Sequence, residues 1–273
     1  MIDNARRNLL LGGTVAGALA LAGVLPGTCA KHGPRKIAMT DDPPNRPPGE
    51  PKPLLDEDIA PVLARLDAWF DGHLPPDRYV FNPPATETEL TAFEHLVGIK
   101  LPRAYHQLYR WHDGEDDDRS GHIYGLPILP LDEVGSQWQA WVDVLAEFGG
   151  DRYKIPGGAW PAGAVDPAYI NPRWIPLTHD GSGNHIGLDF DPWPGGRVGQ
   201  VILFGRDEEV KAVLAESLGK FLDWIVGLLE SGNFRLGLAP GERVLREFRL
   251  KDPPSNDFHD GARILLGAPG PFG

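Results

Sequence analysis

Apolar residues recur along the chain with two different periods. A helical period predicts five helices, over residues 56–70, 86–97, 101–112, 132–148 and 207–230. Short alternating or continuously apolar runs predict four strands, over residues 174–177, 185–189, 200–204 and 244–250. The segment 207–230 has the widest apolar stripe, and it starts with acidic residues, which the positive end of a helix dipole favours.

Local signals mark the ends of the second and third predicted helices. Thr86 and Glu89 have the spacing of a capping box, in which each side chain accepts a hydrogen bond from the other residue's backbone. Gly98 is suited to the left-handed conformation that ends many helices. Pro102 stands near the start of the next helix, where proline is tolerated.

The three strands predicted between residues 174 and 206 form a β-meander. Residues 180–184 and 192–196 are rich in Gly, Asn, Asp and Pro and supply its two turns. Pro176 indicates an edge strand, because proline cannot donate a ladder hydrogen bond. The apolar run 200–204 indicates a buried strand.

Two segments lack a regular pattern. Residues 151–172 are rich in Gly and Pro, which predicts a long irregular insertion that lines a surface cleft. Residues 253–273 predict a loose tail. The core is expected to bury four residues together: Trp174, Leu188, Ile202 and Leu218.

The N-terminal residues have the order of an export signal. Arg6 and Arg7 precede an apolar run rich in Gly and Ala, and small residues lead to a cleavage position after Ala30. The paired arginines resemble a twin-arginine signal. An uncleaved anchor is the alternative, and lipid attachment to Cys29 is disfavoured because Pro26 stands where leucine is expected.

This order divides the chain into four parts. We expect a twin-arginine-like export signal over residues 1–30, a Pro-rich linker over 31–55, one folded domain over 56–234 and a C-terminal extension over 235–273. The predicted location is the periplasm, or anchorage on the outer side of the inner membrane through the N-terminal signal alone.

The chain is acidic, with a formal net charge of -12. This balance excludes nucleic acid as the expected partner, because phosphate contacts need clustered lysine and arginine. An acidic surface attracts a basic protein instead. The predicted partner-binding rim, with a tryptophan as its anchor, consists of Asp113, Glu115, Asp116, Asp117, Asp118, Asp180, Asp189, Asp191 and Trp193. For the acidic run 115–118, the alternative is a solvated loop without a partner.

A metal-dependent hydrolase is the alternative function. His179, His185 and Asp189 lie close in sequence, and Asp189 and Asp191 alternate on a strand, which places both carboxylates on one face. The sequence has no H-x-x-E-H spacing, no G-x-S-x-G motif and no phosphate loop. We therefore expect no enzyme, no cofactor and no resident metal.

Short motifs follow one another in a distinctive order: Leu101-Pro102, Leu108-Tyr109-x-x-His112-Asp113-Gly114, Trp174-x-Pro176, Asp180-Gly181-x-Gly183-Asn184, Gly187-Leu188-Asp189-x-Asp191-Pro192 and Gly199-Gln200-Val201-Ile202. With these motifs, residues 56–234 resemble the Smi/Knr cell-wall-assembly regulator family of the SUKH superfamily. The resemblance implies an α+β fold with a mixed or antiparallel sheet flanked by helices. It also implies protein binding rather than catalysis.

Members of that family have two known kinds of role. Bacterial members commonly neutralise a toxin, and fungal members bind signalling partners in cell-wall regulation. Combined with the export signal, the resemblance predicts a non-catalytic protein-binding module. We expect an exported immunity-type protein or a cell-envelope adaptor, whose partner is a basic toxin or an envelope protein.

Overall fold

The computed structural model describes residues 46–76, 79–115, 121–238, 245–255 and 257–273. The predicted export signal and the first part of the predicted linker lie outside these residues. Residues 46–55 of that linker are described, and they lie against the domain. Lys52 N–H donates to the Gly196 carbonyl at 2.9 Å, and Val198 N–H donates to the Lys52 carbonyl at 3.0 Å.

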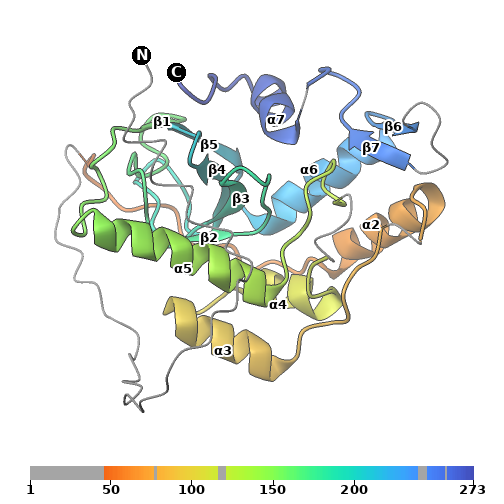
Figure 1. The fold of residues 1–273 in the computed structure, drawn as a ribbon, viewed down its shortest axis with the longest axis horizontal. Helices are drawn as coiled ribbons and strands as arrows, with labels where there is room; N and C mark the ends of the chain where they lie inside the picture. The colour runs from red at the N-terminus through yellow and green to blue at the C-terminus, as the bar shows by residue number, and fades with distance from the viewer. Residues whose placement is uncertain (1–45, 77–78, 116–120, 239–244, 256) are drawn as a thin grey trace, which may run out of the picture. The chain divides into compact units, whose positions relative to one another are not determined.

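The described residues form six helices and seven strands, which confirms the predicted α+β class (Figure 1). The helices are α2 (Ala60–His73), α3 (Glu87–Val97), α4 (Arg103–Trp111), α5 (Leu131–Glu147), α6 (Leu218–Glu230) and α7 (Phe258–Leu266). The strands are β1 (Gly158–Trp160), β2 (Trp174–Pro176), β3 (Asn184–Asp189), β4 (Gln200–Gly205), β5 (Val210–Ala215), β6 (Arg235–Leu238) and β7 (Leu245–Arg249).

Five of these strands form one mixed sheet in the order β1-β5-β4-β3-β2. Strands β2, β3 and β4 pair antiparallel in chain order, which confirms the predicted meander. Pro176 lies on β2, an edge strand, as predicted. At the other edge, β1 pairs parallel with β5. Strands β6 and β7 form a separate antiparallel ribbon.

The predicted ends of α3 are confirmed. Glu89 N–H donates to the Thr86 hydroxyl at 3.3 Å, and Thr86 N–H donates to the Glu89 carboxylate at 2.7 Å. Gly98 has a φ of 66°, and its N–H donates to the Glu94 carbonyl. Both ends of this helix are therefore fixed by residues that the sequence shows directly.

The segment 207–230 is not one helix, and the prediction is wrong for its first half. Its beginning forms β5, which pairs with β4 on one side and with β1 on the other. Alternate residues of β5 pack into the apolar clusters on the two faces of the sheet. The helix α6 starts only at Leu218, where the Ser217 hydroxyl accepts from Lys220 N–H at 3.2 Å. Packing in the sheet overrides the helical spacing of this stretch.

Residues 253–273 are not a loose tail, and this prediction is also wrong. The Asp257 side chain caps the start of α7, and Gly267 ends the helix in the left-handed conformation. Phe258 is buried in the main core. Beyond the helix, the Pro271 carbonyl accepts from Val210 N–H at 2.8 Å, which ties the last residues to β5.

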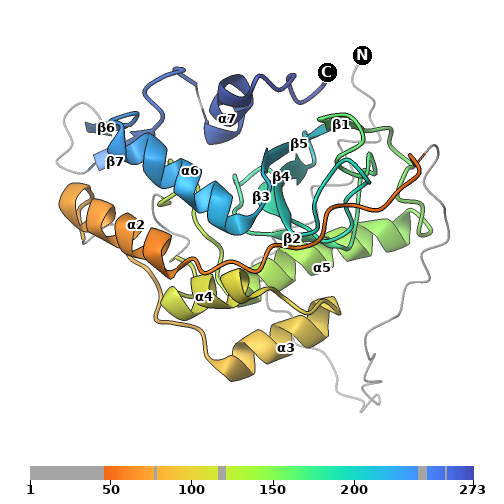
Figure 2. The ribbon, with the colours of Figure 1, turned by 180° about the vertical axis from the view of Figure 1, so that it is seen from behind.

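The sheet separates two apolar clusters. On one face, α6 covers β4 and β5, and α2 lies beside α6 (Figures 1 and 2). Leu188 and Leu218 belong to the cluster on this face. Trp174 and Ile202 belong to the cluster on the other face, which residues 151–172 cover. All four residues are buried, but the prediction of one shared cluster is wrong, because neighbouring strand residues point to opposite faces.

Candidate functional site

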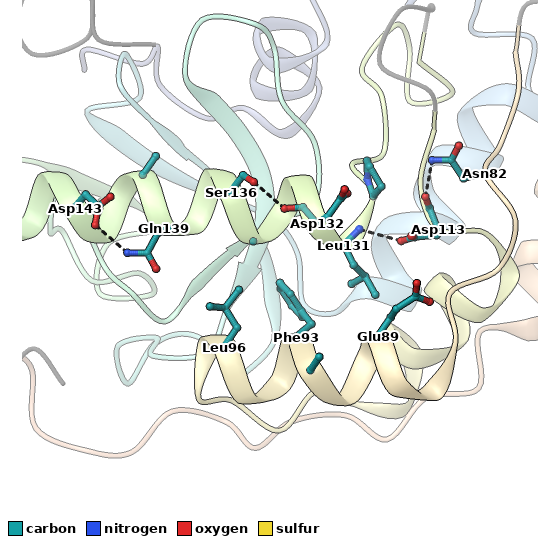
Figure 3. A pocket seen from close by; sticks show the side chains of 14 residues that line it. Asn82, Glu89, Phe93, Leu96, Asp113, Leu131, Asp132, Ser136, Gln139 and Asp143 are labelled. Atoms are coloured by element: carbon teal, nitrogen blue, oxygen red, sulfur yellow. Dashed lines mark hydrogen bonds between the residues drawn. The ribbon is translucent and has the colours of Figure 1, made fainter. Parts of the chain in front are cut away.

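A groove with a volume of about 860 Å³ runs between α3 and α5 (Figure 3). Phe93 and Leu96 from α3 and Leu131 from α5 give it an apolar floor. The carboxylates in its lining are Glu89, Asp113, Asp132 and Asp143. No lysine, arginine or histidine is among the described residues of the lining. The groove is therefore apolar at its base and negative along its walls.

Gly135 keeps this groove open. A Cβ at this position would lie 3.0 Å from Leu96 Cδ2 and 4.0 Å from Phe93 Cε2. A larger side chain would project into the space between α3 and α5. Leu96 is 43% exposed, so the groove presents apolar surface to solvent. Exposed apolar surface with a polar border is typical of an interaction site.

Asp113 fixes the start of α5 at one end of the groove. Leu131 N–H donates to its carboxylate, and the Asn82 side-chain amide donates to its carbonyl, both at 2.9 Å. Pro130, which precedes the helix, has no side chain that can cap it, so Asp113 supplies the acceptor. Burial raises the pKa of Asp113, although the bond from Leu131 opposes the rise.

The remaining lining carboxylates make only local hydrogen bonds in the part of the chain that the structure describes. The Asp143 carboxylate accepts from the Gln139 amide at 2.9 Å, and the Asp132 carboxylate accepts from Glu133 N–H at 2.8 Å. Glu89 belongs to the capping box of α3. No basic side chain of the described residues pairs with these groups, so their negative charges remain available to a cation.

Glu115, which was expected to face solvent, is buried, and that expectation is wrong. It is 4% exposed, and its carboxylate accepts from the backbone N–H groups of His122 and Ile128. These hydrogen bonds compensate for burying a charged group. The rest of the acidic run lies outside the described residues: Asp116, Asp117 and Asp118.

Two further rim residues serve local structure. The Asp180 carboxylate accepts from Ser182 N–H at 2.7 Å and from Asn184 N–H at 3.0 Å. Burial acts to raise the pKa of Asp180, but the bonds from Asn184 and Ser182 outweigh burial and lower it. Asp191 is half-buried and forms an ion pair with Arg152 at 3.2 Å. Both residues therefore stabilise the turns around them.

Asp189 and Trp193 are buried, so the expectation of their exposure is wrong. Asp189 is fully buried and accepts from Asp191 N–H at 2.9 Å and from the Gln200 amide at 3.0 Å. Trp193 is 7% exposed, because residues 151–172 pack over its turn. Its backbone N–H donates to the Ala164 carbonyl of that segment at 3.2 Å. Among the predicted rim residues that the structure describes, Asp113 alone lines the groove.

The residues named for a hydrolase do not converge. Both ring nitrogens of His185 are engaged, Nδ1 with the Thr178 carbonyl at 2.9 Å and Nε2 with Trp141 Nε1 at 3.2 Å. Burial lowers the pKa of His185 to about 3 and keeps the ring neutral. His179 stacks on this ring, whereas Asp189 is four residues further along β3, about 13 Å away at ~3.3 Å per residue. Among the described residues, no group of three acidic, His or Cys side chains is arranged to hold a metal.

Asp189 is expected to make the stability of the fold depend on pH. Burial raises its pKa to about 7, so the folded protein keeps a proton that the unfolded chain releases from about pH 4. The Asp189 carboxyl therefore makes its full contribution to the free energy of unfolding at low pH, and this contribution is lost as pH rises through about 7. His185 acts in the opposite direction, because its contribution is lost as pH falls towards about 3.

A comparison of variants isolates the contribution of Asp189. In Asp189→Asn the side chain at this position carries no charge at any pH. Because the pKa of Asp189 is raised, the free energy of unfolding of the variant relative to the wild type should increase by a few kcal/mol between pH 4 and pH 8, measured by urea unfolding. Asp71→Asn, an exposed change on α2, should show no such trend. A difference between wild type and Asp189→Asn that stays constant with pH would show that Asp189 is already ionised in the fold.

Comparisons with known proteins give a consistent picture. The sequence model of the SMI1 / KNR4 family (SUKH-1) matches residues 84–224. The chain is 32% identical over 232 residues to the cell wall assembly regulator SMI1 of Saccharomyces cerevisiae, covering 71% of this chain and 46% of that protein. It is 28% identical over 223 residues to the glucan synthesis regulatory protein of Neurospora crassa, covering 70% of this chain and 42% of that protein.

A third relative is also named as a cell-wall regulator. The cell wall biosynthesis/cell cycle regulator smi1 of Schizosaccharomyces pombe is 32% identical over 162 residues, which cover 55% of this chain and 32% of that protein. The chain thus spans less than half the length of each of these three relatives. All three are named as regulators.

The predicted location is wrong. A periplasm, or the outer side of an inner membrane, requires a bacterial envelope, whereas these relatives are cell-wall regulators of fungi, whose cells are eukaryotic. The predicted signal residues Arg6, Arg7 and Ala30 lie outside the described part of the chain. Among the described helices, none is long and apolar enough to cross a membrane.

The family resemblance inferred from the sequence is confirmed. The matched residues 84–224 run from just before α3 into α6, so they include both walls of the groove and the whole meander. They make up more than half of the chain. This chain belongs to the SMI1/KNR4 (SUKH-1) family.

Proposed function

We propose that this chain is a non-catalytic protein-binding module that regulates cell-wall assembly, and that its partner binds in the groove between α3 and α5. The regulatory part is supported by relatives named as regulators of cell-wall assembly and glucan synthesis. The binding part rests on one observation. An open groove with an apolar floor has four carboxylates and no basic side chain in its described lining.

Charge complementarity selects the occupant of this groove. An amphipathic helix buries apolar residues spaced by three and four positions, and it presents its polar side chains to the groove walls. Glu89 lies on one wall, and Asp132 and Asp143 lie on the other. Lysines or arginines beside the apolar face of a partner helix would meet these carboxylates. The proposed ligand is therefore a basic amphipathic segment of a partner protein.

The acidic run 116–118 follows Asp113 in the sequence, and we include it in the proposed surface on that ground alone. Neutralisation of a basic toxin, the other role suggested by the sequence, would use the same negative surface. The matched relatives are named for cell-wall regulation rather than for immunity, so the proposal adopts the regulatory class.

Gly135→Leu is expected to block this groove without unfolding the protein. The new side chain starts 3.0 Å from Leu96 Cδ2, at the end of a flexible side chain that can move aside. Replacing a helical glycine also favours the helix by ~1 kcal/mol, which offsets crowding. Gly227→Leu is the matched control, because it lies in α6 with no atom within 4 Å of the added Cβ.

The probe is a synthetic helical peptide with leucines on one face and lysines on the other. Fluorescence anisotropy should show binding to wild type that weakens with salt, and no binding of the same peptide with glutamates in place of lysines. Gly135→Leu should weaken binding at least about tenfold, equivalent to ~1.4 kcal/mol. Gly227→Leu should bind as wild type. Equal affinities for all three proteins would remove the groove as the binding site.

A further inference from the structure

A second cavity, with a volume of about 480 Å³, lies between the β6–β7 ribbon and α7. Arg235 and Arg249 from the ribbon and Arg263 from α7 line it. Asp260 is the single acidic side chain among the described residues of this lining. The chain as a whole has a formal net charge of -12, so a cavity with three arginines stands out from its surroundings. Its elements differ from those that form the groove between α3 and α5.

The two ribbon arginines are placed against each other. Arg235 and Arg249 are directly opposite partners in the antiparallel register of β6 and β7. Opposite residues of such a pair share one face, with Cβ atoms about 4.5–5.5 Å apart. Arg235 Nε donates to the Leu250 carbonyl at 3.3 Å, which restrains this side chain beside its neighbour. Two guanidinium groups on one face of the ribbon can both contact an anion in the cavity.

The third arginine is buried. Arg263 is 2% exposed and pairs with the Glu208 carboxylate, and it donates to the carbonyls of Val210 and Pro269. Its Nε atom has no hydrogen-bond partner among the described residues. A buried donor without a partner costs free energy, and an anion in the cavity would offer an acceptor. This second observation is independent of the pairing between β6 and β7.

We propose that this cavity binds a phosphate group, either free phosphate or the phosphate of a monoester. Guanidinium groups bind phosphate oxygens through paired, charge-assisted hydrogen bonds, which the two ribbon arginines can supply, and Arg263 Nε can add a single donor. The cavity is many times larger than the ~30 Å³ of one water, which leaves room for the group that carries the phosphate. Burial, together with the charges of Asp257 and Glu208, raises the pKa of Asp260, which eases its protonation beside a bound anion.

Thermal melting of the full chain tests this site. At constant ionic strength, inorganic phosphate should raise the melting temperature in a saturable way relative to chloride, because a ligand that binds only the folded state stabilises it. Phosphoserine is the second probe. A larger shift with phosphoserine identifies a monoester as the ligand class, and an equal shift identifies phosphate alone. No shift with either probe overturns the proposal.

Variants test whether phosphate binds in this cavity. Arg235→Gln changes an exposed side chain, so the fold should persist, and calorimetric titration with phosphate should show affinity reduced about tenfold, or ~1.4 kcal/mol. Arg103→Gln is the matched control, since it removes another exposed arginine. Arg103 lies on α4, away from the cavity, and pairs with Asp58. Unchanged phosphate affinity in Arg235→Gln, or an equal loss in both variants, would show that phosphate is not held in this cavity.

Discussion

Replacing Glu115 by alanine is expected to destabilise the fold by ~3–5 kcal/mol, because it removes a buried carboxylate that accepts from two buried backbone N–H groups. The carboxylate accepts from Ile128 N–H at 2.8 Å and from His122 N–H at 3.1 Å. His122 Nδ1 lies 2.7 Å from the same group. Alanine would leave two buried backbone donors without their acceptor and would remove the carboxylate beside a buried imidazole, and each lost acceptor carries a desolvation cost.

Urea unfolding of two further variants separates the hydrogen bonds from the charge. Glu115→Gln keeps an oxygen that can accept from Ile128, so its loss of stability should be intermediate. Asp71→Ala removes a carboxylate from an exposed position on α2 and should change the midpoint little. If Glu115→Ala unfolded at the wild-type midpoint, the buried carboxylate would contribute nothing to the fold.

The sequence predicts the elements whose signals are local. The capping box of Thr86 and Glu89 involves residues three positions apart, and the structure shows both of its hydrogen bonds. The strands of the meander are neighbours in sequence and in the sheet, so their turns and alternation were sufficient to order them. Pro176 marked the edge strand because its missing N–H excludes a central position.

The errors arise where distant residues decide the structure. Strand β5 has helical apolar spacing, but β1 and β4 supply hydrogen-bond partners that only the folded sheet provides. Glu115 lies in an acidic run, yet the N–H groups of His122 and Ile128 converge on it from the following loop. Trp193 lies in a turn between prolines, but residues 151–172 cover it. None of these partners is visible from local pattern alone.

The sequence predicts only part of the groove lining. Asp113 was named as a candidate, and its position after α4 brings it to the start of α5. Gly135 carried the missing signal, since a glycine inside a helical run costs ~1 kcal/mol relative to alanine and calls for a packing reason. The reason is the close approach of Leu96 across the groove. That contact depends on how α3 and α5 are placed in the fold.

Asp166→Ala is expected to destabilise the fold by a similar amount, ~3–5 kcal/mol, because it breaks a buried ion pair. Asp166 is 1% exposed, and Arg152 Nη2 lies 3.0 Å from its carboxylate. Tyr153 OH donates to it at 2.9 Å, and the Asn171 amide donates to it at 3.2 Å. These bonds hold the irregular segment over the second face of the sheet, where Trp174 is buried.

A paired replacement tests whether the charge or the shape of this network holds the segment. Replacing both partners, Arg152→Met with Asp166→Leu, removes both charges of the buried pair. Asp191 also loses Arg152, but it is half-buried and still accepts from the Asn171 amide at 3.0 Å. The paired variant should therefore cost less than Asp166→Ala alone in thermal melting. Glu87→Ala, which breaks the exposed pair with Arg110, should shift the melting temperature little. If the paired variant were less stable than Asp166→Ala, the Arg152–Asp166 pair would add more to the stability of the fold than the cancellation of its two charges. In either case, binding of the lysine peptide to the folded protein should persist, because the network and the groove share no residue.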